Sequence, residues 1–463
     1  KWLSPVQRGA SPRPIDDPKY FDEDGEYAWV RIADVSASDG VLRETTQKLS
    51  VLGSSLSVKI APGELFVSIA GTVGKPCISE IKACIHDGFV YFPRLKINPK
   101  LLYRIFESET CYGGLGKWGT QLNLNTDTIG SIRVALPPQK ELSLVLSFLD
   151  RETAKIDALI AEQQRLIELL KEKRQAVISH AITTGLNPDV PMKDSGVEWL
   201  GEVPEHWEVK RLKEVCEIFP SNVDKKTYEN EMPVLLCNYT DVYYNEKITS
   251  QIDFMVATAS AEQVKKFTLR EGDTIITKDS ETADDIAIAA YVPQDLPNVI
   301  CGYHLSMIRP REATCGAFIK RLFDSIYVKS CCAVYANGLT RVGLGQYALD
   351  NLEMPFPPKS EQQTIAAFLD RETAKIDALI AEQQRLIELL KEKQQSVISH
   401  AVTKGLNPNA PMKDSGIEWL GEVPEHWEVR KLNSFSNKIT NGYVGPTRDI
   451  LVEDGVPYAQ ATH

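Results

Sequence analysis

The stretch FLDRETAKIDALIAEQQRLIELLKEK at Phe148–Lys173 occurs a second time, without a single change, at Phe368–Lys393. The two copies lie 220 residues apart, and the similarity continues to Leu212 and Leu432 with nine differences in 65 positions. A repeat of this length means that the chain builds one structural element twice. The differing pairs include Arg174/Gln394, Thr184/Lys404 and Lys210/Arg430.

The repeated stretch has the heptad pattern of a coiled-coil helix, with apolar residues every seven positions and leucines between them. No residue breaks it between about Lys140 and Thr183, so the helix would be roughly 65 Å long, longer than a small domain is wide. Two such helices bury their apolar stripes most simply by packing on each other in antiparallel orientation. The alternative is a single solvated helix. The predicted helix-pair interface consists of Leu149, Ile156, Leu159, Gln163, Leu166, Leu170 and Val177, with the copies Leu369, Ile376, Leu379, Gln383, Leu386, Leu390 and Val397.

Length and composition indicate an ordinary globular protein. The chain has 463 residues, enough for two to four domains, and 43% of them are hydrophobic. No segment approaches 18 uninterrupted apolar residues and no signal peptide is visible, so we expect a cytoplasmic protein without membrane contact. Nine cysteines without metal-ligand spacing indicate reduced thiols and no metal site. The first residue is Lys1 rather than Met, which suggests a processed, trimmed or fragmentary start.

The net charge of −11 does not exclude a nucleic-acid partner, because the acidic residues are unevenly distributed. Residues 1–140 hold 17 Lys and Arg against 15 Asp and Glu, which leaves −13 for the remainder. A nearly neutral domain can still present a basic face to DNA.

Two divergent domains alternate with the two repeated helices, which predicts an α+β fold. The expected divisions are a first globular domain at 1–139, a helix at 140–184, a connector and second domain at 185–358, a second helix at 359–404, and a connector copy with a partial third domain at 405–463. The second domain repeats the plan of the first with little identity. Pro137-Pro138 and Pro357-Pro358, which close the two domains, are again 220 residues apart.

The motifs of common catalytic sites are missing. Gly71–Lys75 (GTVGK) resembles a phosphate-binding loop, but Ile69 stands where the first glycine belongs and Pro76 where Ser or Thr belongs. The chain has no HExxH, no GxSxG and no Asn/Asp-Pro-Pro-aromatic methyltransferase tetrapeptide. We therefore expect a chain that binds rather than catalyses.

Glycine- and proline-rich loops carry the side chains that read base edges and phosphates. In the first domain the loops hold cations, hydroxyls, an amide and an aromatic ring, and the second domain has a comparable set. Ordinary solvated loops would have the same composition, so that alternative stays open. The candidate DNA-binding residues are Arg8, Ser11, Arg13, Lys75, Lys117, Trp118, Thr120 and Gln121 in the first domain, and Lys225, Lys226, Lys278, Ser280, Asn337, Thr340 and Arg341 in the second.

The connector EWLGEVPEHWEV at Glu198–Val209, repeated at Glu418–Val429, completes a recognisable pattern. Two variable domains, two nearly identical helices and this connector resemble the DNA-specificity subunit of type I restriction-modification systems over essentially the whole chain. The resemblance implies two target-recognition domains, each reading one half of a split double-stranded DNA sequence, separated by an antiparallel coiled coil. The helices would space the domains and dock two methyltransferase subunits.

The resemblance also implies that the chain itself is not an enzyme. S-adenosylmethionine and the adenine methylation would belong to the methyltransferase subunits, while ATP and magnesium would belong to separate restriction and translocase subunits that cut phage DNA. The alternative is a scaffold whose coiled coil and variable domains bind proteins without DNA specificity. A DNA footprint with two separated protected blocks would distinguish the two.

The ends of the chain depart from the family pattern. The first domain lacks the connector that precedes the second domain, whereas an additional copy follows the second helix. We expect Trp419–Leu432 to pack against the first domain and thereby close the chain. Asn433–His463 has the character of the start of a third, divergent domain.

Overall fold

The computed structural model describes residues 6–113, 115 and 124–432. Contacts divide the chain into two compact units, Lys1–Ile160 with the segment from Glu388 onward, and Ala161–Ile387. Each unit therefore contains parts of both long helices, α5 (Gln139–Thr184) and α12 (Lys359–Lys404). Among the helices of the described residues, none is long and apolar enough to cross a bilayer.

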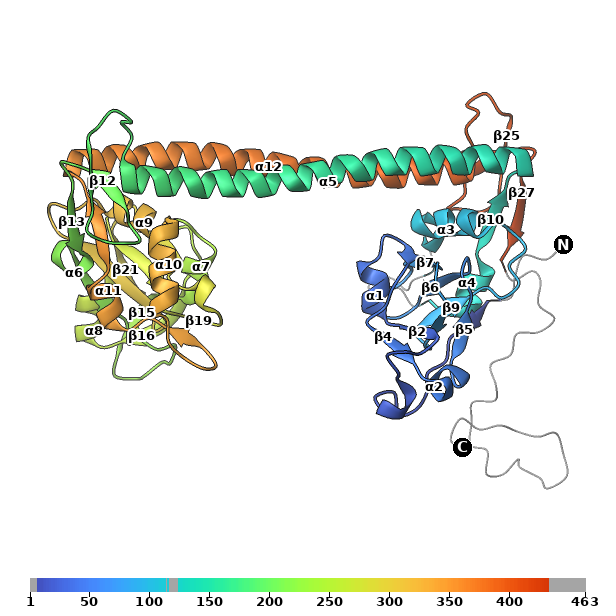
Figure 1. The fold of residues 1–463 in the computed structure, drawn as a ribbon, viewed down its shortest axis with the longest axis horizontal. Coiled ribbons are helices and arrows are strands. Elements are labelled where there is room, and N and C mark those ends of the chain that lie inside the picture. Colours follow the sequence, from blue (N-terminus) through green and yellow to red (C-terminus); the bar gives the residue numbers. More distant parts are fainter. Residues whose placement is uncertain (1–5, 114, 116–123, 433–463) are drawn as a thin grey trace, which may run out of the picture. The chain divides into compact units, whose positions relative to one another are not determined.

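The globular part of the second unit is built on two four-stranded sheets, and β15, β16 and β21 of one of them are labelled in Figure 1. The order of the first sheet is β14-β22-β18-β20, all antiparallel, and that of the second is β16-β15-β21-β17, in which only β15 and β21 run parallel. The strands are β14 (Cys216–Pro220), β22 (Leu305–Pro310), β18 (Thr274–Thr277), β20 (Ala289–Tyr291), β16 (Met255–Ala259), β15 (Met232–Cys237), β21 (Leu296–Cys301) and β17 (Thr268–Leu269).

The first unit repeats this plan. Its sheets have the orders β1-β9-β6-β7-β3 and β4-β2-β8-β5, and in the second of them β2 and β8 are again the parallel pair. The predicted α+β class and the common plan of the two domains are thus confirmed. The strands are β1 (Gln7–Arg8), β9 (Phe89–Tyr91), β6 (Leu65–Ser68), β7 (Pro76–Ser79), β3 (Val41–Leu42), β4 (Gln47–Leu49), β2 (Tyr27–Val30), β8 (Ala83–Ile85) and β5 (Val58–Ile60).

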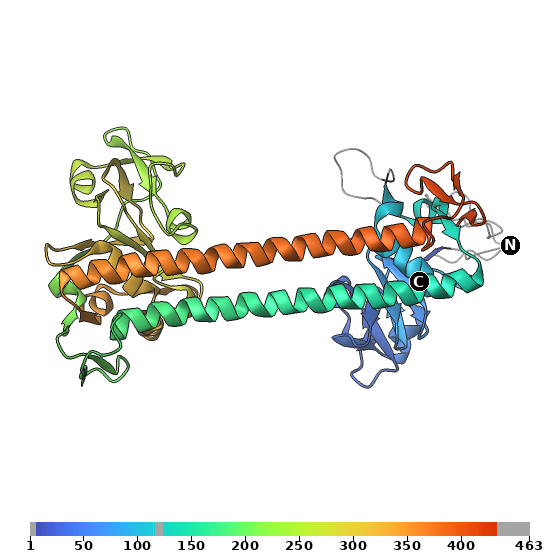
Figure 2. The ribbon, with the colours of Figure 1, turned by 90° about the horizontal axis from the view of Figure 1, so that it is seen from above.

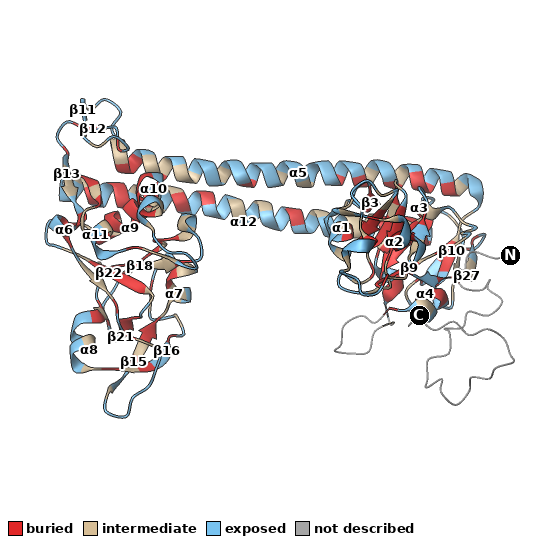
Figure 3. Ribbon diagram, turned by 60° about the horizontal axis from the view of Figure 1, so that its bottom comes forward, coloured by how far each residue is buried: buried red, intermediate tan, exposed pale blue. Residues whose placement is uncertain are grey.

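Short helices cover the sheets, and the buried residues of each unit, red in Figure 3, are mostly apolar. An amphipathic helix, α3 in the first unit and α9 in the second, packs against the neighbouring long helix. The first unit contains α1 (Ile32–Ala37), α2 (Val51–Ser55), α3 (Pro99–Glu107) and α4 (Thr126–Ser131). The second contains α6 (Leu212–Val215), α7 (Tyr239–Tyr243), α8 (Ala261–Phe267), α9 (Gly316–Asp324), α10 (Ile326–Tyr335) and α11 (Gln346–Asp350).

The long helices run antiparallel, as predicted, and lie side by side in Figure 2. In the first unit, Leu149 of α5 shares a core with Ile398 and Val402 near the end of α12. In the second unit, the end of α5 packs near the start of α12 around Leu369. Asp157 accepts a hydrogen bond of 2.8 Å from Gln394, and Arg174 pairs with Asp377 at 2.9 Å. The two contacts are equivalent in the repeat, so each unit contains the same pair of positions in contact between the helices.

The predicted seam is wrong at two of its seven positions in each helix. Leu159 and Leu379 are 44% exposed, and Leu166 and Leu386 are 39% exposed. The second inward residue of each heptad comes four positions after Leu149, Ile156 and Gln163 rather than three. The buried and half-buried residues are therefore Thr153, Ile160 and Ile167. The other predicted positions, Leu149, Gln163, Leu170 and Val177 with their copies, are buried or half-buried.

The connectors dock in the same way in both units. β13 (Glu208–Arg211) pairs with β24 (Glu353–Phe356), and β27 (Glu428–Lys431) pairs with β10 (Arg133–Leu136) in the same register. His206 contacts Glu361 at 2.9 Å, and His426 contacts Glu141 at 2.7 Å. Shorter ribbons within each connector are β11 (Met192–Asp194) with β12 (Glu202–Pro204), and β25 (Met412–Asp414) with β26 (Glu422–Pro424).

Packing of Trp419–Leu432 against the first domain is therefore confirmed. Leu432 lies in the core of the first unit, and its backbone N–H donates to the Ile132 carbonyl at 2.8 Å. Trp427 is buried and its indole N–H donates to Glu141 at 3.1 Å. The expectation for Asn433–His463 falls outside the described residues.

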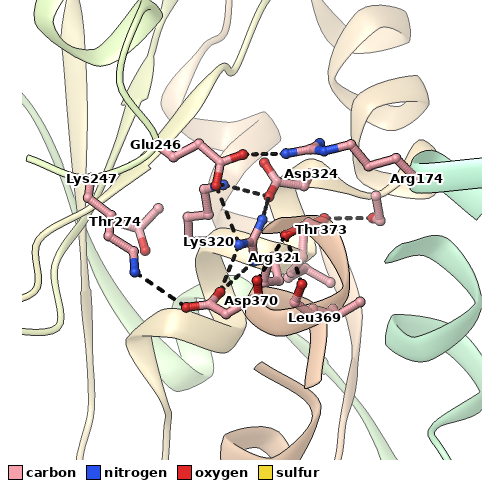
Figure 4. A network of polar contacts seen from close by, with 12 residues as sticks. Arg174, Glu246, Lys247, Thr274, Lys320, Arg321, Asp324, Leu369, Asp370 and Thr373 are labelled. Carbon is pink, nitrogen blue, oxygen red and sulfur yellow. Dashed lines mark hydrogen bonds and ion pairs between the residues drawn. The ribbon is translucent and has the colours of Figure 1, made fainter. Parts of the chain in front are cut away.

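An ion network fastens α9 to the long helices (Figure 4). Arg321 is buried and donates to Asp370 at 2.7 and 3.0 Å, and it also pairs with Asp324 at 3.0 Å. Glu246 faces Arg321 and contacts Arg174 of α5. The first unit has the same arrangement, in which Arg104 of α3 contacts Asp150 at 2.8 Å and Glu107 at 2.7 Å. Asp150 and Asp370 are the same position of the repeat.

Glu246 makes the second unit sensitive to acid. Burial alone would raise its pKa, but Lys320, Arg321 and Arg174 outweigh burial and lower the pKa from 4.5 to about 2. A carboxylate with a depressed folded pKa stabilises the fold above its unfolded pKa and loses this contribution as the pH falls. We expect Glu246→Gln to destabilise the protein at neutral pH, with a difference that disappears between pH 4.5 and about 2. Denaturant unfolding of both proteins across this range checks it, and a difference independent of pH would contradict it.

Candidate nucleic-acid interface

Polar loops of the second unit meet where the parallel strands β15 and β21 end. α7 follows β15, and the turn Gly302–His304 follows β21. The ribbon of β19 (Asp279–Ser280) and β23 (Val342–Gly343) lies beside this turn, because the Lys278 backbone N–H donates to the His304 carbonyl at 3.0 Å. Loops held on a rigid sheet are the usual place for binding residues.

Asp279 is the centre of this cluster. Its carboxylate contacts His304 Nδ1 at 2.8 Å and Arg341 Nη2 at 2.9 Å. Half of the Arg341 side chain and about a third of the His304 side chain are exposed, 50% and 36%, whereas Asp279 is 20% exposed. The carboxylate thus lies behind two exposed nitrogen-bearing side chains.

A small cavity of about 110 Å³ lies next to the cluster. Its walls include Lys225, Tyr239, Tyr303 and His304. Tyr239 stacks on Tyr243 with ring centroids 5.5 Å apart, and the Tyr243 hydroxyl donates to Asp285 at 2.9 Å. Tyrosine rings, a lysine and an arginine in one place provide stacking surfaces and phosphate-binding charge.

The predicted lysines of the second unit fall into two groups. Lys225 and Lys226 are exposed. Lys278 is held instead, because its amine donates to the Ser221 carbonyl at 2.8 Å and lies 4.4 Å from the Tyr303 ring centroid. Burial lowers the pKa of Lys278. Lys278 therefore contributes to the positions of Ser221 and Tyr303 rather than projecting into solvent.

The remaining predicted residues of the second unit lie on or beneath the β19–β23 ribbon. Asn337, Thr340 and Arg341 are exposed in the loop between α10 and β23. Asn337 donates through Nδ2 to the Tyr335 carbonyl at 2.9 Å. Ser280 is 2% exposed and is not available to a ligand in this arrangement.

In the first unit, Arg8, Ser11 and Arg13 converge on Asp87. Ser11 donates to its carboxylate at 3.1 Å and Arg13 lies 3.4 Å from it, while Arg8 donates to the Asp87 carbonyl. Asp87 lies in the turn between β8 and β9, which corresponds to the turn Gly302–His304 between β21 and β22. Arg8, Ser11 and Arg13 of the first unit and Arg341 of the second thus lie at the same end of the common plan, each around an aspartate.

Lys75, a candidate DNA-binding residue, has a structural role instead. Its amine donates to the carbonyls of Ser36 and Ser38 at 2.9 and 3.0 Å, which satisfies the end of α1, and burial lowers its pKa. Lys117, Trp118, Thr120 and Gln121 lie outside the described residues.

Sequence reasoning missed Asp87, Tyr239, Asp279, Tyr303 and His304. Asp279 lies in a two-residue strand, the other four come two or three residues after a strand ends, and no motif marks them. Only the strand order shows that these positions are neighbours. Within the described part of the chain, no group of three or more His, Cys, Asp or Glu side chains is arranged to hold a metal ion, and the nine cysteines are unpaired.

Comparison with known proteins gives a consistent result. Residues 204–389 match the family model described as Type I restriction modification DNA specificity domain. The chain is 27% identical over 269 residues to a protein described as the specificity subunit of the type I restriction enzyme MjaX of Methanocaldococcus jannaschii. The matched region covers 56% of this chain and 60% of that protein. It is 22% identical over 251 residues to the type I restriction enzyme EcoKI specificity subunit of Escherichia coli, covering 52% of this chain and 51% of that protein.

A solved structure shares the fold. It comes from a study of complex assembly and conformational transition of the type I R-M system, and its TM-score is 0.65 at 16% identity, covering 88% of this chain and all of that one. The chain spans about 60% of the first relative's length. The family model and the relatives thus show a similarity to type I restriction-modification specificity subunits, and the solved structure shows a shared fold.

Proposed function

We propose that this specificity subunit reads a double-stranded DNA target in two parts, one with each globular unit. The observation that carries the proposal is that two units of one plan gather nitrogen-bearing side chains at the same end. These are Arg8 and Arg13 around Asp87, and His304 and Arg341 around Asp279. Arginine is the side chain that most often contacts guanine in the major groove. The chain would act in the cytoplasm on cellular and phage DNA.

The partners in this proposal are two methyltransferase subunits, with restriction and translocase subunits in the complete complex. The repeat supports a pair of identical partners, since α5 and α12 present the same surface twice. Leu169 and Leu389 are each 51% exposed at the same position of the repeat, which offers an apolar contact in duplicate. The partners would bring S-adenosylmethionine, ATP and magnesium, and this chain would bind none of them.

The proposed role is recognition without catalysis. The full chain, incubated alone with DNA, magnesium and S-adenosylmethionine, is expected to leave the DNA unmethylated and uncut. Methyl transfer or cleavage by the pure chain would overturn this part of the proposal. The other candidate, a protein-binding scaffold, is supported only by the exposed leucines of the helices and does not explain the arginines around Asp87 and Asp279.

Arg341 should read the DNA of one half-site only. We expect Arg341→Ala in the full chain, assembled with its methyltransferase subunits, to weaken binding by about 1–3 kcal/mol at one base pair of one half-site. Lys225→Ala serves as the control, because loss of a phosphate contact weakens all sequences alike and reduces the salt dependence. Competition binding with DNA altered in one half-site at a time measures both effects. Equal losses at both half-sites for Arg341→Ala would exclude base reading by this residue.

A further inference from the structure

We propose that Asp279 determines the base preference of the second unit by fixing two side chains that contact neighbouring bases, the readers Arg341 and His304. The inference rests on the proposed DNA recognition and names the residues that carry its specificity. Asp279 itself does not touch DNA in this proposal, so it is a positioning residue. The parts come from three segments, namely β19, the turn after β21 and the loop before β23.

The loop that carries Arg341 is held firmly at its base. Asn337 and Gly343 exchange two backbone hydrogen bonds of 3.1 and 2.9 Å, and the Leu344 N–H donates to the Lys278 carbonyl at 2.8 Å. Gly338 allows the chain to turn there, because a Cβ at this position would lie 1.9 Å from the Arg341 carbonyl oxygen. A loop closed in this way loses little freedom when it binds.

Asp279 fixes the orientation of the Arg341 guanidinium. The carboxylate forms an ion pair with Nη2 at 2.9 Å, and the Arg341 side chain remains half exposed. A guanidinium has five N–H donors in one plane, so an ion pair at one nitrogen restricts where the group lies and leaves donors for the two acceptors of guanine, O6 and N7. Arg341 is thus placed to donate hydrogen bonds to a guanine.

Asp279 also fixes the ring of His304. Nδ1 lies 2.8 and 3.0 Å from the two carboxylate oxygens. Because a carboxylate only accepts, Nδ1 carries the proton, and Nε2 is left for a second base. Tyr303 packs against the imidazole edge-on, at 5.1 Å between ring centroids, and is itself held by Lys278. The same carboxylate therefore controls two exposed readers.

Stability alone does not account for this arrangement. Ion pairs that reach solvent contribute little to folding, and half of the Arg341 side chain and about a third of the His304 side chain are exposed. A carboxylate beside a DNA-binding surface also repels phosphates, so it weakens binding in general unless it improves selection. Ion pairs that add little stability and a charge that repels phosphates are both explained if Asp279 serves base specificity.

The test compares base preferences rather than overall affinity. The full chain, assembled with its methyltransferase subunits, would bind DNA from a library randomised in one half-site at a time, and the bound DNA would be sequenced. The variants are Asp279→Asn, Arg341→Lys, His304→Ala and the control Asp295→Asn. Asp295 lies at the opposite end of β21 and accepts from the Glu271 backbone, so its change alters charge equally without touching the readers.

We expect Asp279→Asn to reduce the preference for guanine at one base pair of the second half-site roughly fivefold or more, and to weaken the preference at a neighbouring base pair. Its affinity for unrelated DNA should stay the same or rise, because a negative charge is removed. Arg341→Lys should lose the guanine preference, His304→Ala the neighbouring one, and the double change Asp279→Asn with Arg341→Lys should lose no more guanine preference than Arg341→Lys alone. Asp295→Asn should match the original protein.

An unchanged preference profile for Asp279→Asn would overturn the inference. So would an equal loss of affinity for all sequences, because that result indicates a structural role. If the original chain selects no sequence at all, the proposed function fails as well, and this outcome is distinct from the first two. Melting curves of each variant identify any loss of folding, and Arg341→Lys and His304→Ala still test the readers if Asp279→Asn unfolds.

Discussion

Replacement of Arg321 by methionine is expected to destabilise the second unit by about 3 kcal/mol, or roughly 6–12 °C in melting temperature for a unit of this size. The Arg321 side chain is 4% exposed and faces Asp324, Asp370 and Glu246. Methionine fills a similar volume, so the loss comes mainly from carboxylates left without their cation. Because Asp370 and Glu246 reach solvent, the effect lies at the lower end of that for a fully buried pair.

The chain offers a matched control in the same network. Lys247 contacts the same carboxylate, Asp370, at 3.5 Å, but its side chain is 52% exposed. Lys247→Met should therefore change the free energy of unfolding by less than about 1 kcal/mol. Denaturant unfolding of the two variants measures the difference. Comparable losses for Arg321→Met and Lys247→Met would show that the buried arginine does not fasten α9 to α12.

Lengthening both long helices by one heptad is expected to widen the gap between the two half-sites by about three base pairs. Asp157 pairs with Gln394 and Arg174 with Asp377, so the pairing is symmetric about Arg165–Leu166 in α5 and Arg385–Leu386 in α12. Insertion of seven residues at both points preserves the seam in each unit. Each helix becomes longer by about 10 Å, while base pairs are spaced ~3.4 Å apart.

The sequence read by each unit should stay the same in this variant, because neither cluster of loops is altered. Insertion into α5 alone is the control. It shifts one seam against the other and should destabilise the protein rather than move the half-sites. Selection of DNA with variable gaps would measure the outcome. An unchanged gap with both heptads inserted would show that the helix pair does not set the spacing.

The repeat was enough to predict the antiparallel helices, because an apolar seam on a helix this long has to find a partner. The same pattern gave the wrong register. Leu159 and Leu166 are more apolar than Thr153, yet Thr153 is buried and donates from its hydroxyl to the Leu149 carbonyl at 2.9 Å. Hydrophobicity alone did not distinguish a leucine beside the seam from a threonine within it.

The candidate site was only partly predictable, for a different reason. Arg13 and Arg341 stand in loops and Arg8 ends the short strand β1, and all three have turn-forming neighbours that composition can identify. Asp87 and Asp279, which gather them, are single acidic residues among the 63 Asp and Glu of the chain. Their role depends on the neighbours that strand order brings to one end of each unit, and with little identity between the two domains the sequence does not reveal that shared order.

The central claim is that the two units read separate parts of one DNA target. Footprinting of the full chain, assembled with its methyltransferase subunits on selected DNA, tests it most directly when performed with the original protein, Arg13→Ala and Arg341→Ala. The account predicts two protected blocks with an unprotected gap, one block weakened by Arg13→Ala and the other by Arg341→Ala. A single continuous block, or two blocks weakened equally by either change, would contradict it.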